Sequence, residues 1–298
     1  MKGDMMYDMM IRKKVLKIQE RLGMRLGVAY GTSKIPVARS ADQVLECLRE
    51  LYKVGLRAFV LPKELFGGIY TSTDLYKAKY GELLKIRELA SKFNIELSLR
   101  HDSLPGQPDE VLNTFCNIMS IMDARTFIVQ PNFYANMPQD QALKLVIYKL
   151  NEITTNLRVS AKIGVENTGR MREVGSFEDM VDIVKRTSGT EPIVNWAHIH
   201  ARGSGSLRSQ EDFSRITQTL RRELGTGWMQ KAFFIFSGVS YGPSGMTRLA
   251  PIDGSDLRFE YLIKASMAMG LRGTIILDSP EKEKYVVKNL EKISDMVR

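Results

Sequence analysis

The chain has 298 residues with a formal net charge of +9, and 44% of them are hydrophobic and 26% charged, as in ordinary globular proteins. Its two cysteines, Cys47 and Cys116, exclude a disulfide framework, and the absence of roughly 18 consecutive apolar residues excludes a membrane-spanning helix. We expect a cytoplasmic location, because the charged N-terminus lacks the apolar core of a signal peptide. The positive surplus favours polyanionic partners such as nucleic acid.

Short apolar runs alternate with longer amphipathic segments along the chain. The runs expected to form strands are residues 25–30, 57–61, 95–101, 126–131, 162–167, 192–199, 231–238 and 273–279. The segments expected to form helices are residues 40–54, 73–93, 108–123, 139–156, 176–187, 209–224, 256–269 and 281–297. Continuously apolar strands indicate a parallel sheet buried on both faces, and eight strand–helix units favour closure into a single (β/α)₈ TIM barrel.

The first 24 residues lie outside this alternation. We expect a basic helix over residues 11–22, which either closes the barrel floor or forms an extension. The chain is therefore divided into an N-terminal basic helix or extension, residues 1–24, and a barrel domain, residues 25–298. Ser176 and Ser209 each precede an acidic first turn, so both are expected to be N-caps of helices.

Ionisable side chains recur just after the apolar runs. His101, Glu166 and Asp278 each end one run, and His198 and His200 end another. Loops after the carboxyl ends of the strands carry the active sites of parallel α/β barrels. Histidine nitrogen and carboxylate oxygen together suit Zn²⁺ or Mn²⁺, although at least one of the two neighbouring histidines is expected to be structural.

Five short motifs follow one another at these strand ends. They are RHDS (100–103), GVENTG (164–169), WAHIHAR (196–202), FSGVSYG (236–242) and LDSP (277–280). In this order and spacing they resemble the endonuclease IV family of abasic-site DNA repair enzymes, most of all its archaeal branch. The resemblance covers nearly the whole chain from Met24 onward. It implies an endonuclease IV-like, xylose isomerase-like TIM barrel, three zinc ions and cleavage of DNA on the 5′ side of an abasic site.

The resemblance gives metal-binding roles to four residues of this sequence. His101 matches a metal-binding histidine, and Glu166 matches the carboxylate that bridges two zinc ions. His198 matches a histidine of the third zinc, and Asp278 stands where the family has a glutamate. Glu166 would then be the catalytic residue, acting as metal bridge or base.

The chain departs from the family pattern at the other ligand positions. Gln130 replaces a histidine and Asn195 an aspartate, and the segments 233–236 and 246–249 contain neither histidine nor acid. A catalytic zinc needs about three protein ligands, so a three-zinc cluster is not expected. We expect zero or one divalent ion (zinc, manganese or magnesium), bound by the remaining ligands with help from the amide oxygens of Gln130 and Asn195. Without a metal, a buried Glu166 would need Arg100 or a lysine to balance its charge.

Basic side chains are frequent on the same loops. Those expected to contact nucleic acid are Lys63, Arg100, Arg170, Arg172 and Arg202. Arginine forms bidentate contacts with phosphate, and such contacts position a protein on the nucleic-acid backbone.

These features predict a DNA repair protein, a metal-dependent phosphodiester hydrolase that acts on abasic or damaged duplex DNA with activity weakened by the lost ligands. Two alternatives stay open. One is a non-catalytic paralogue that binds DNA or a partner protein through the same face. The other is a sugar isomerase or epimerase, whose related barrels use a Glu–Asp–His–Glu metal site of which this chain keeps Glu166 and Asp278. The sequence predicts no particular oligomeric state.

Overall fold

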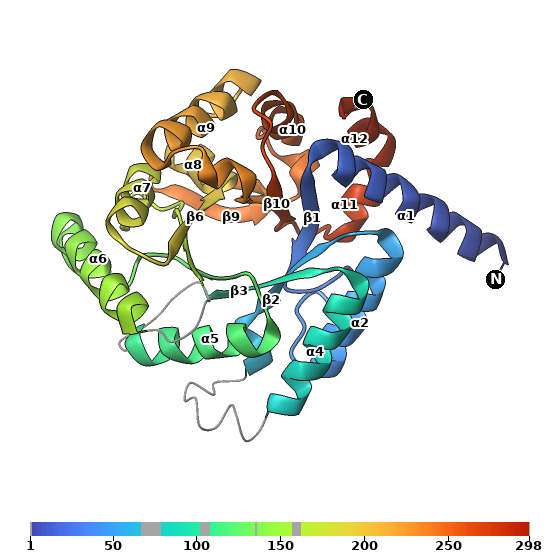
Figure 1. Ribbon diagram of the computed structural model, residues 1–298. Helices are drawn as coiled ribbons and strands as arrows, with labels where there is room; N and C mark the ends of the chain where they lie inside the picture. Colours follow the sequence, from blue (N-terminus) through green and yellow to red (C-terminus); the bar gives the residue numbers. More distant parts are fainter. Residues whose placement is uncertain (1, 67–78, 102–107, 135, 157–161, 298) are drawn as a thin grey trace.

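The computed structural model describes residues 2–66, 79–101, 108–134, 136–156 and 162–297. Eight parallel strands close into a barrel in the order β1, β10, β7, β6, β5, β4, β3, β2 (Figure 1). The barrel strands are β1 Met24–Ala29, β2 Ala58–Pro62, β3 Glu96–His101, β4 Thr126–Val129, β5 Lys162–Glu166, β6 Thr190–Asn195, β7 Ala232–Phe236 and β10 Gly273–Leu277. The predicted (β/α)₈ barrel is confirmed.

Helices surround this barrel (Figure 1). They are α1 Lys2–Leu22, α2 Ala41–Val54, α4 Tyr80–Phe93, α5 Pro108–Met122, α6 Gln139–Asn156, α7 Phe177–Arg186, α8 Trp196–Arg202, α9 Gln210–Leu224, α10 Phe259–Ala268, α11 Glu283–Lys288 and α12 Leu290–Met296. Short 3₁₀ turns are η1 Lys63–Phe66, η2 Gly227–Gln230 and η3 Ile252–Gly254. The predicted N-caps Ser176 and Ser209 are confirmed, because each accepts a hydrogen bond from the backbone N–H three residues later.

Side chains along the strands alternate between two buried layers. One layer fills the barrel interior and includes Val60, Ile128, Ile235 and Ile276. The other lies between barrel and helices, and its strand residues alternate with those of the interior, as Leu277 follows Ile276. This period of two decides which way a side chain at the end of a strand points.

Within the barrel domain, the structure differs from the expected elements at three places. The run 192–199 is a strand only as far as Asn195, and the residues after it form the buried helix α8. The segment after β7 folds into an antiparallel hairpin of β8, Gly238–Gly242, and β9, Gly245–Ala250. The last expected helix is divided into α11 and α12. Residues 73–78 of an expected helix and Asp102 and Ser103 of the RHDS motif lie outside the described residues.

Helix α1 begins nine residues earlier than expected and lies beside the barrel against α2 and α12 (Figure 1). Its second half buries Ile11, Val15, Ile18 and Leu22 in the layer between barrel and helices. Its first half extends away from the barrel, with exposed apolar side chains such as Met6. Across the described residues, no helix has the length and apolar character needed to cross a membrane.

Candidate functional site

Arg100 lies between two buried carboxylates at the carboxyl end of the barrel. Its Nε donates to Glu166 Oε2 at 2.6 Å and its Nη2 donates to Glu166 Oε1 at 2.7 Å, which makes a bidentate pair. Its Nη1 donates to Asp278 Oδ2 at 2.9 Å and also to the hydroxyl of Tyr30. Glu166 is fully buried, so the guanidinium supplies the positive charge that a buried carboxylate requires. This is the pairing expected from the sequence for a Glu166 that binds no metal.

The alternation of side chains along β3 explains why Arg100, and not its neighbour, reaches the carboxylates. Arg100 follows Leu99, a residue of the helix-facing layer, so Arg100 points into the barrel as Glu166 does. His101 points the other way, and its ring contacts the edge of Phe115 on α5 with the ring centroids 5.6 Å apart. The structure therefore corrects the expectation that His101 joins the carboxylates as a metal ligand.

Asn195 and His198 complete the polar group above β5 and β6. Asn195 Nδ2 donates to Glu166 Oε1 at 2.7 Å, and Asn195 Oδ1 accepts from the backbone N–H of His198 at 3.2 Å as the N-cap of α8. His198 Nδ1 lies 2.7 Å from the carbonyl oxygen of Asn167. A carbonyl can only accept, so we place the proton of the neutral ring on Nδ1, which leaves Nε2 as an acceptor. Burial lowers the pKa of His198, which favours this neutral form.

His200 has a structural role. Its Nε2 lies 3.0 Å from Asp256 Oδ1, and its Nδ1 accepts from the backbone N–H of Leu207 at 3.1 Å. Tyr241 of β8 donates its hydroxyl hydrogen to the other oxygen of Asp256 at 2.7 Å. His200 therefore ties α8 to the hairpin and to the segment before α10. The expectation that one of the two neighbouring histidines is structural is met by this residue.

A pocket of about 400 Å³ opens at the carboxyl ends of the strands. Its volume falls within the roughly 300–1,000 Å³ usual for small-molecule sites. The pocket is lined by Tyr30, Arg100, Gln130, Asn132, Gly169, Arg170, Glu173, His198, Met246, Leu249 and Asp278. A Cβ at Gly169 would approach Met246 Cβ to 2.8 Å and His198 Cδ2 to 3.1 Å, so the absence of a side chain lets the loop pass between them.

Asn132 is one of the residues that line this pocket. Its Oδ1 is buried and has no hydrogen-bond partner among the residues that the structure describes. Its Nδ2 donates to Glu173 Oε2 at 3.4 Å, which fixes the orientation of the amide. A buried acceptor without a partner costs about 1–3 kcal/mol, and a ligand hydroxyl would recover this loss.

The donor set does not fit the divalent ion that the resemblance implies. Glu166 and Asp278 both accept from Arg100, and the guanidinium lies where an ion bound by both would have to lie. The amide group that Asn195 turns toward Glu166 is its NH₂, a donor that cannot bind a cation. Within the described ranges, no three His, Cys, Asp or Glu side chains are grouped closely enough to hold a metal. Of the expected ligands, Gln130, His198 and Asp278 line the pocket together.

Two of the expected phosphate contacts are instead internal. Arg100 is buried between the carboxylates. Arg202 donates to the carbonyl oxygens of Arg170, Met171 and Glu173 at 2.6–3.3 Å, and so fixes the loop after β5. A guanidinium satisfied by carbonyls of its own chain does not present its hydrogens to a phosphate. These two expectations are corrected.

The other three basic residues keep access to solvent. The side chain of Arg170 is 66% exposed at the pocket mouth and forms an ion pair with Glu173 at 3.0 Å. Arg172 is exposed on the same loop. Lys63 begins η1 after β2 and is half-buried.

Several residues at the site were not predicted from the sequence, among them Asn132, Glu173, Tyr30 and Lys282. Tyr30 follows β1, adopts a left-handed backbone conformation (φ 69°) and lines the pocket. Lys282 is buried beside it, with its Nζ donating to the carbonyl of Ala29 at 2.8 Å and lying 5.6 Å from the Tyr30 ring. Burial lowers the pKa of Lys282. Tyr30 could have been found from its place after a strand, whereas Lys282 lies beyond the LDSP motif and has no such signal.

Comparison with known proteins establishes the fold class. No model of a known protein family matches the chain. An uncharacterized protein of Methanocaldococcus jannaschii is 22% identical over 264 residues, covering 85% of this chain and 92% of that protein. The IolI protein with a binding zinc atom is similar in structure, with a TM-score of 0.61 and 14% identity, covering 92% of this chain and 95% of that one.

Two further solved structures resemble the chain. The xylose isomerase domain protein of Planctomyces limnophilus gives a TM-score of 0.60 at 10% identity, covering 92% of this chain and 97% of that one. D-psicose 3-epimerase of Clostridium cellulolyticum H10 with D-tagatose gives 0.58 at 12% identity, covering 86% and 84%. The chain thus has the fold of the xylose isomerase-like TIM barrels. The resemblance read from the sequence holds at the level of the fold, and these likenesses give no specific support to its endonuclease IV branch.

Proposed function

We propose that the pocket at the carboxyl ends of the strands binds a small polyhydroxylated molecule of the sugar type. The observation that carries this proposal is Asn132 in the pocket wall, whose buried Oδ1 has no hydrogen-bond partner within the described part of the chain. His198 Nε2 and the carboxylate of Asp278 are further acceptors in the same wall. A set of acceptors selects a ligand rich in O–H donors, because each hydroxyl can satisfy one of them. Met246 and Leu249 offer an apolar surface to the C–H face of such a ligand.

The positive charge at the base of this pocket is supplied by Arg100. It holds Glu166 and Asp278 in fixed positions, and its own position is fixed by the bidentate pair. Such a preorganised cation orients the polar groups around it without a bound metal. The sugar-modifying barrels among the structural neighbours support this reading over DNA repair.

His198 is the residue that we assign to proton transfer. Its neutral ring has an unprotonated Nε2, and its Nδ1–H is held by the Asn167 carbonyl, which keeps the ring orientation fixed. A neutral, buried histidine can accept a proton from a ligand carbon next to a carbonyl group, which leaves an enediolate, and can return this proton to the former carbonyl carbon from the same side. The hydroxyl proton of the ligand passes at the same time to the former carbonyl oxygen, so that atoms and charge balance. The proposed activity is therefore of the isomerase type.

Ligand binding is tested by calorimetry with D-fructose and D-tagatose in buffer containing a chelator. Asn132→Ala should weaken binding about tenfold, the effect of losing one hydrogen bond worth roughly 1.4 kcal/mol. The matched control is Gln141→Ala, an exposed amide on α6, which should leave binding unchanged. Binding that appears only after addition of Zn²⁺ or Mn²⁺ would contradict the role given to Arg100.

Proton transfer is tested separately by NMR in D₂O. Incubation with the bound ketose should exchange the hydrogen on the carbon beside the carbonyl group, and His198→Gln should abolish the exchange while the protein stays folded. Full exchange in this variant would show that His198 does not transfer the proton.

Nucleic-acid binding is the second candidate, favoured by one observation. Arg170, Arg172 and Arg248 are exposed around or near the pocket mouth, and the chain has a net charge of +9. Exposed arginines suit phosphate contacts. This candidate predicts binding of duplex DNA that weakens with salt, and a preference for abasic duplex would distinguish repair from non-specific attraction.

A further inference from the structure

The barrel carries a ring of charged residues at the end opposite the candidate site. Six strands have a basic residue within one position of their first residue, and the other two have a glutamate there. The basic residues are Arg25, Arg57, Arg125, Lys162, Lys231 and Arg272, and the acids are Glu96 and Glu191. Six cations against two acids leave a surplus of four positive charges. Residues at this end of such barrels usually serve stability, which calls for balanced ion pairs rather than a surplus.

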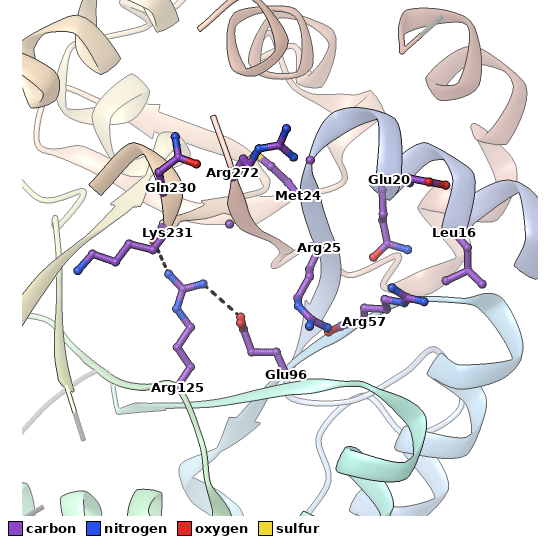
Figure 2. A pocket seen from close by; sticks show the side chains of 13 residues that line it. Leu16, Glu20, Met24, Arg25, Arg57, Glu96, Arg125, Gln230, Lys231 and Arg272 are labelled. Carbon is purple, nitrogen blue, oxygen red and sulfur yellow. Dashed lines mark hydrogen bonds and ion pairs between the residues drawn. The ribbon is translucent and has the colours of Figure 1, made fainter. Parts of the chain in front are cut away.

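A pocket of about 800 Å³ opens inside this ring. Five of the six cations line it, from the starts of β1, β2, β4, β7 and β10 or the residue before them, while α1 forms one wall through Leu16, Gln19 and Glu20 (Figure 2). This pocket is separate from the candidate site, because it opens where the strands begin. Among the described residues, the acids in its lining are Glu20 and Glu96.

Two of the five cations form hydrogen bonds that connect neighbouring segments at this end of the barrel. Arg125 donates to Glu96 Oε1 at 3.3 Å, to Thr274 Oγ1 at 3.0 Å and to the carbonyl of Lys231 (Figure 2 shows the contacts to Glu96 and Lys231). Arg25 donates to the carbonyl and side-chain oxygens of Asn94, each at 3.0 Å. Glu96 is therefore paired with Arg125. Arg57, Lys231 and Arg272 are the pocket cations whose charge these contacts do not balance.

The remaining cations are poorly neutralised by the protein. The ammonium groups of Lys231 and Lys162 lie side by side, and this repulsion lowers the Lys231 pKa. The Nε of Arg57 is buried and lacks a hydrogen-bond partner in the described part of the chain. Glu191 is buried, and its Oε1 lies 3.8 Å from Nε of Arg125, so Arg125 is the ring cation that forms an ion pair with this acid. Arg272 is exposed at the rim. Adjacent like charges are unfavourable unless an anion lies between them.

We propose that this pocket binds a small anion with two or more phosphate groups. Cations placed at the starts of five strands around one concavity can contact several phosphates at once, which a single phosphate could not exploit. The concave shape and the wall formed by α1 fit a compact ligand better than the rod of a nucleic-acid duplex. The proposal is independent of the sugar-type ligand at the other end of the barrel.

Calorimetry with sodium tripolyphosphate on the full chain tests the proposal. The double variant Lys231→Gln/Arg272→Gln removes two exposed cations of the ring and should weaken tripolyphosphate binding at least tenfold. The control Lys144→Gln/Arg221→Gln removes two exposed cations on α6 and α9, outside the ring, and should change binding less than twofold. Thermal unfolding of both variants near the parent Tm shows that the fold is retained.

Several results would overturn the proposal. They are the absence of tripolyphosphate binding, equal weakening in both double variants, and orthophosphate bound as tightly as tripolyphosphate. Tighter binding of a duplex DNA, lost in the Lys231→Gln/Arg272→Gln variant alone, would assign the ring to nucleic acid instead.

Discussion

At the scale of single residues, Arg100 decides how the candidate site works. A buried ion pair is not by itself evidence of stability, but removal of one partner leaves an uncompensated charge in the interior. Among the described residues, Arg100 pairs with the carboxylates of Glu166 and Asp278, both at least nine-tenths buried. The whole polar group therefore depends on one guanidinium.

The first prediction follows from this dependence. Arg100→Met keeps a side chain of similar length but removes the charge, and we expect a loss of about 3–5 kcal/mol in the free energy of unfolding. Urea denaturation measures it, with the exposed Arg248→Met expected to stay within about 0.5 kcal/mol of the parent. Adding Glu166→Gln to Arg100→Met should recover part of the loss. A loss below about 1 kcal/mol would show that the carboxylates do not need this arginine.

The second prediction concerns pH. Burial lowers the pKa of both His198 and His200, so the unfolded chain, with histidine near its usual value of about 6.5, takes up protons first as the pH falls. Stability is then fully present above about pH 6.5 and decreases below it, by at most about 1.4 kcal/mol per pH unit for each histidine. His198→Gln should reduce this slope between pH 6.5 and 5 in urea denaturation. An unchanged slope would mean that folding does not lower the pKa of His198.

At the scale of elements, the sequence predicted the barrel well because each strand is a short apolar run bounded by caps and glycines. The prediction was wrong where one apolar run passes from a strand into a buried helix. The run 192–199 continues as apolar residues because α8 is buried, and a short apolar run does not distinguish strand from buried helix. Asn195 was the signal, since it is a favoured N-cap residue at the point where the strand ends.

The direction of side chains was the other source of error. His101 and Arg100 are neighbours in one strand, so only one of them could point into the barrel. The resemblance favoured the histidine, whereas the charge of a buried Glu166 required the arginine. The internal role of Arg202 could not be predicted from the alternation along a strand, because its carbonyl partners lie on a different loop, 29–32 residues away in the sequence.

The third prediction tests whether α1 belongs to the barrel. Deleting residues 1–9 removes only the part that extends from the barrel, and the Tm should change little. Deleting residues 1–22 also removes Ile11, Val15, Ile18 and Leu22, each worth roughly 1.5–3 kcal/mol of burial. That sum is comparable with the total stability of a typical domain, about 5–15 kcal/mol, so this chain should not fold. Circular dichroism of both truncations measures the outcome, and a folded product of the longer deletion would make residues 1–24 a dispensable extension.

At the scale of the whole molecule, the charge of +9 is not concentrated on one face. Exposed arginines lie near the pocket mouth, and the charged ring lies at the other end of the barrel. An enzyme that recognises a lesion in DNA needs contacts to the damaged nucleotide as well as to phosphates, since phosphate contacts carry little information. In this chain, Arg100, which is paired with two carboxylates, forms the floor of the pocket that would receive such a nucleotide, where a metal-dependent enzyme would have metal ligands.

We therefore expect the protein to bind duplex DNA without preference for damage. Fluorescence anisotropy should give affinities within about twofold for an intact duplex and for the same duplex with one abasic site, because both offer the same phosphates. Raising the salt from 50 to 200 mM should weaken both at least tenfold, as counterion release requires of a protein that contacts several phosphates. Arg170→Gln/Arg172→Gln should weaken both duplexes equally. A preference of ten times or more for the abasic duplex, or its cleavage on the 5′ side of the lesion with added Mg²⁺, Mn²⁺ or Zn²⁺, would instead support the DNA repair activity and reject the sugar-type ligand as the natural occupant of the pocket.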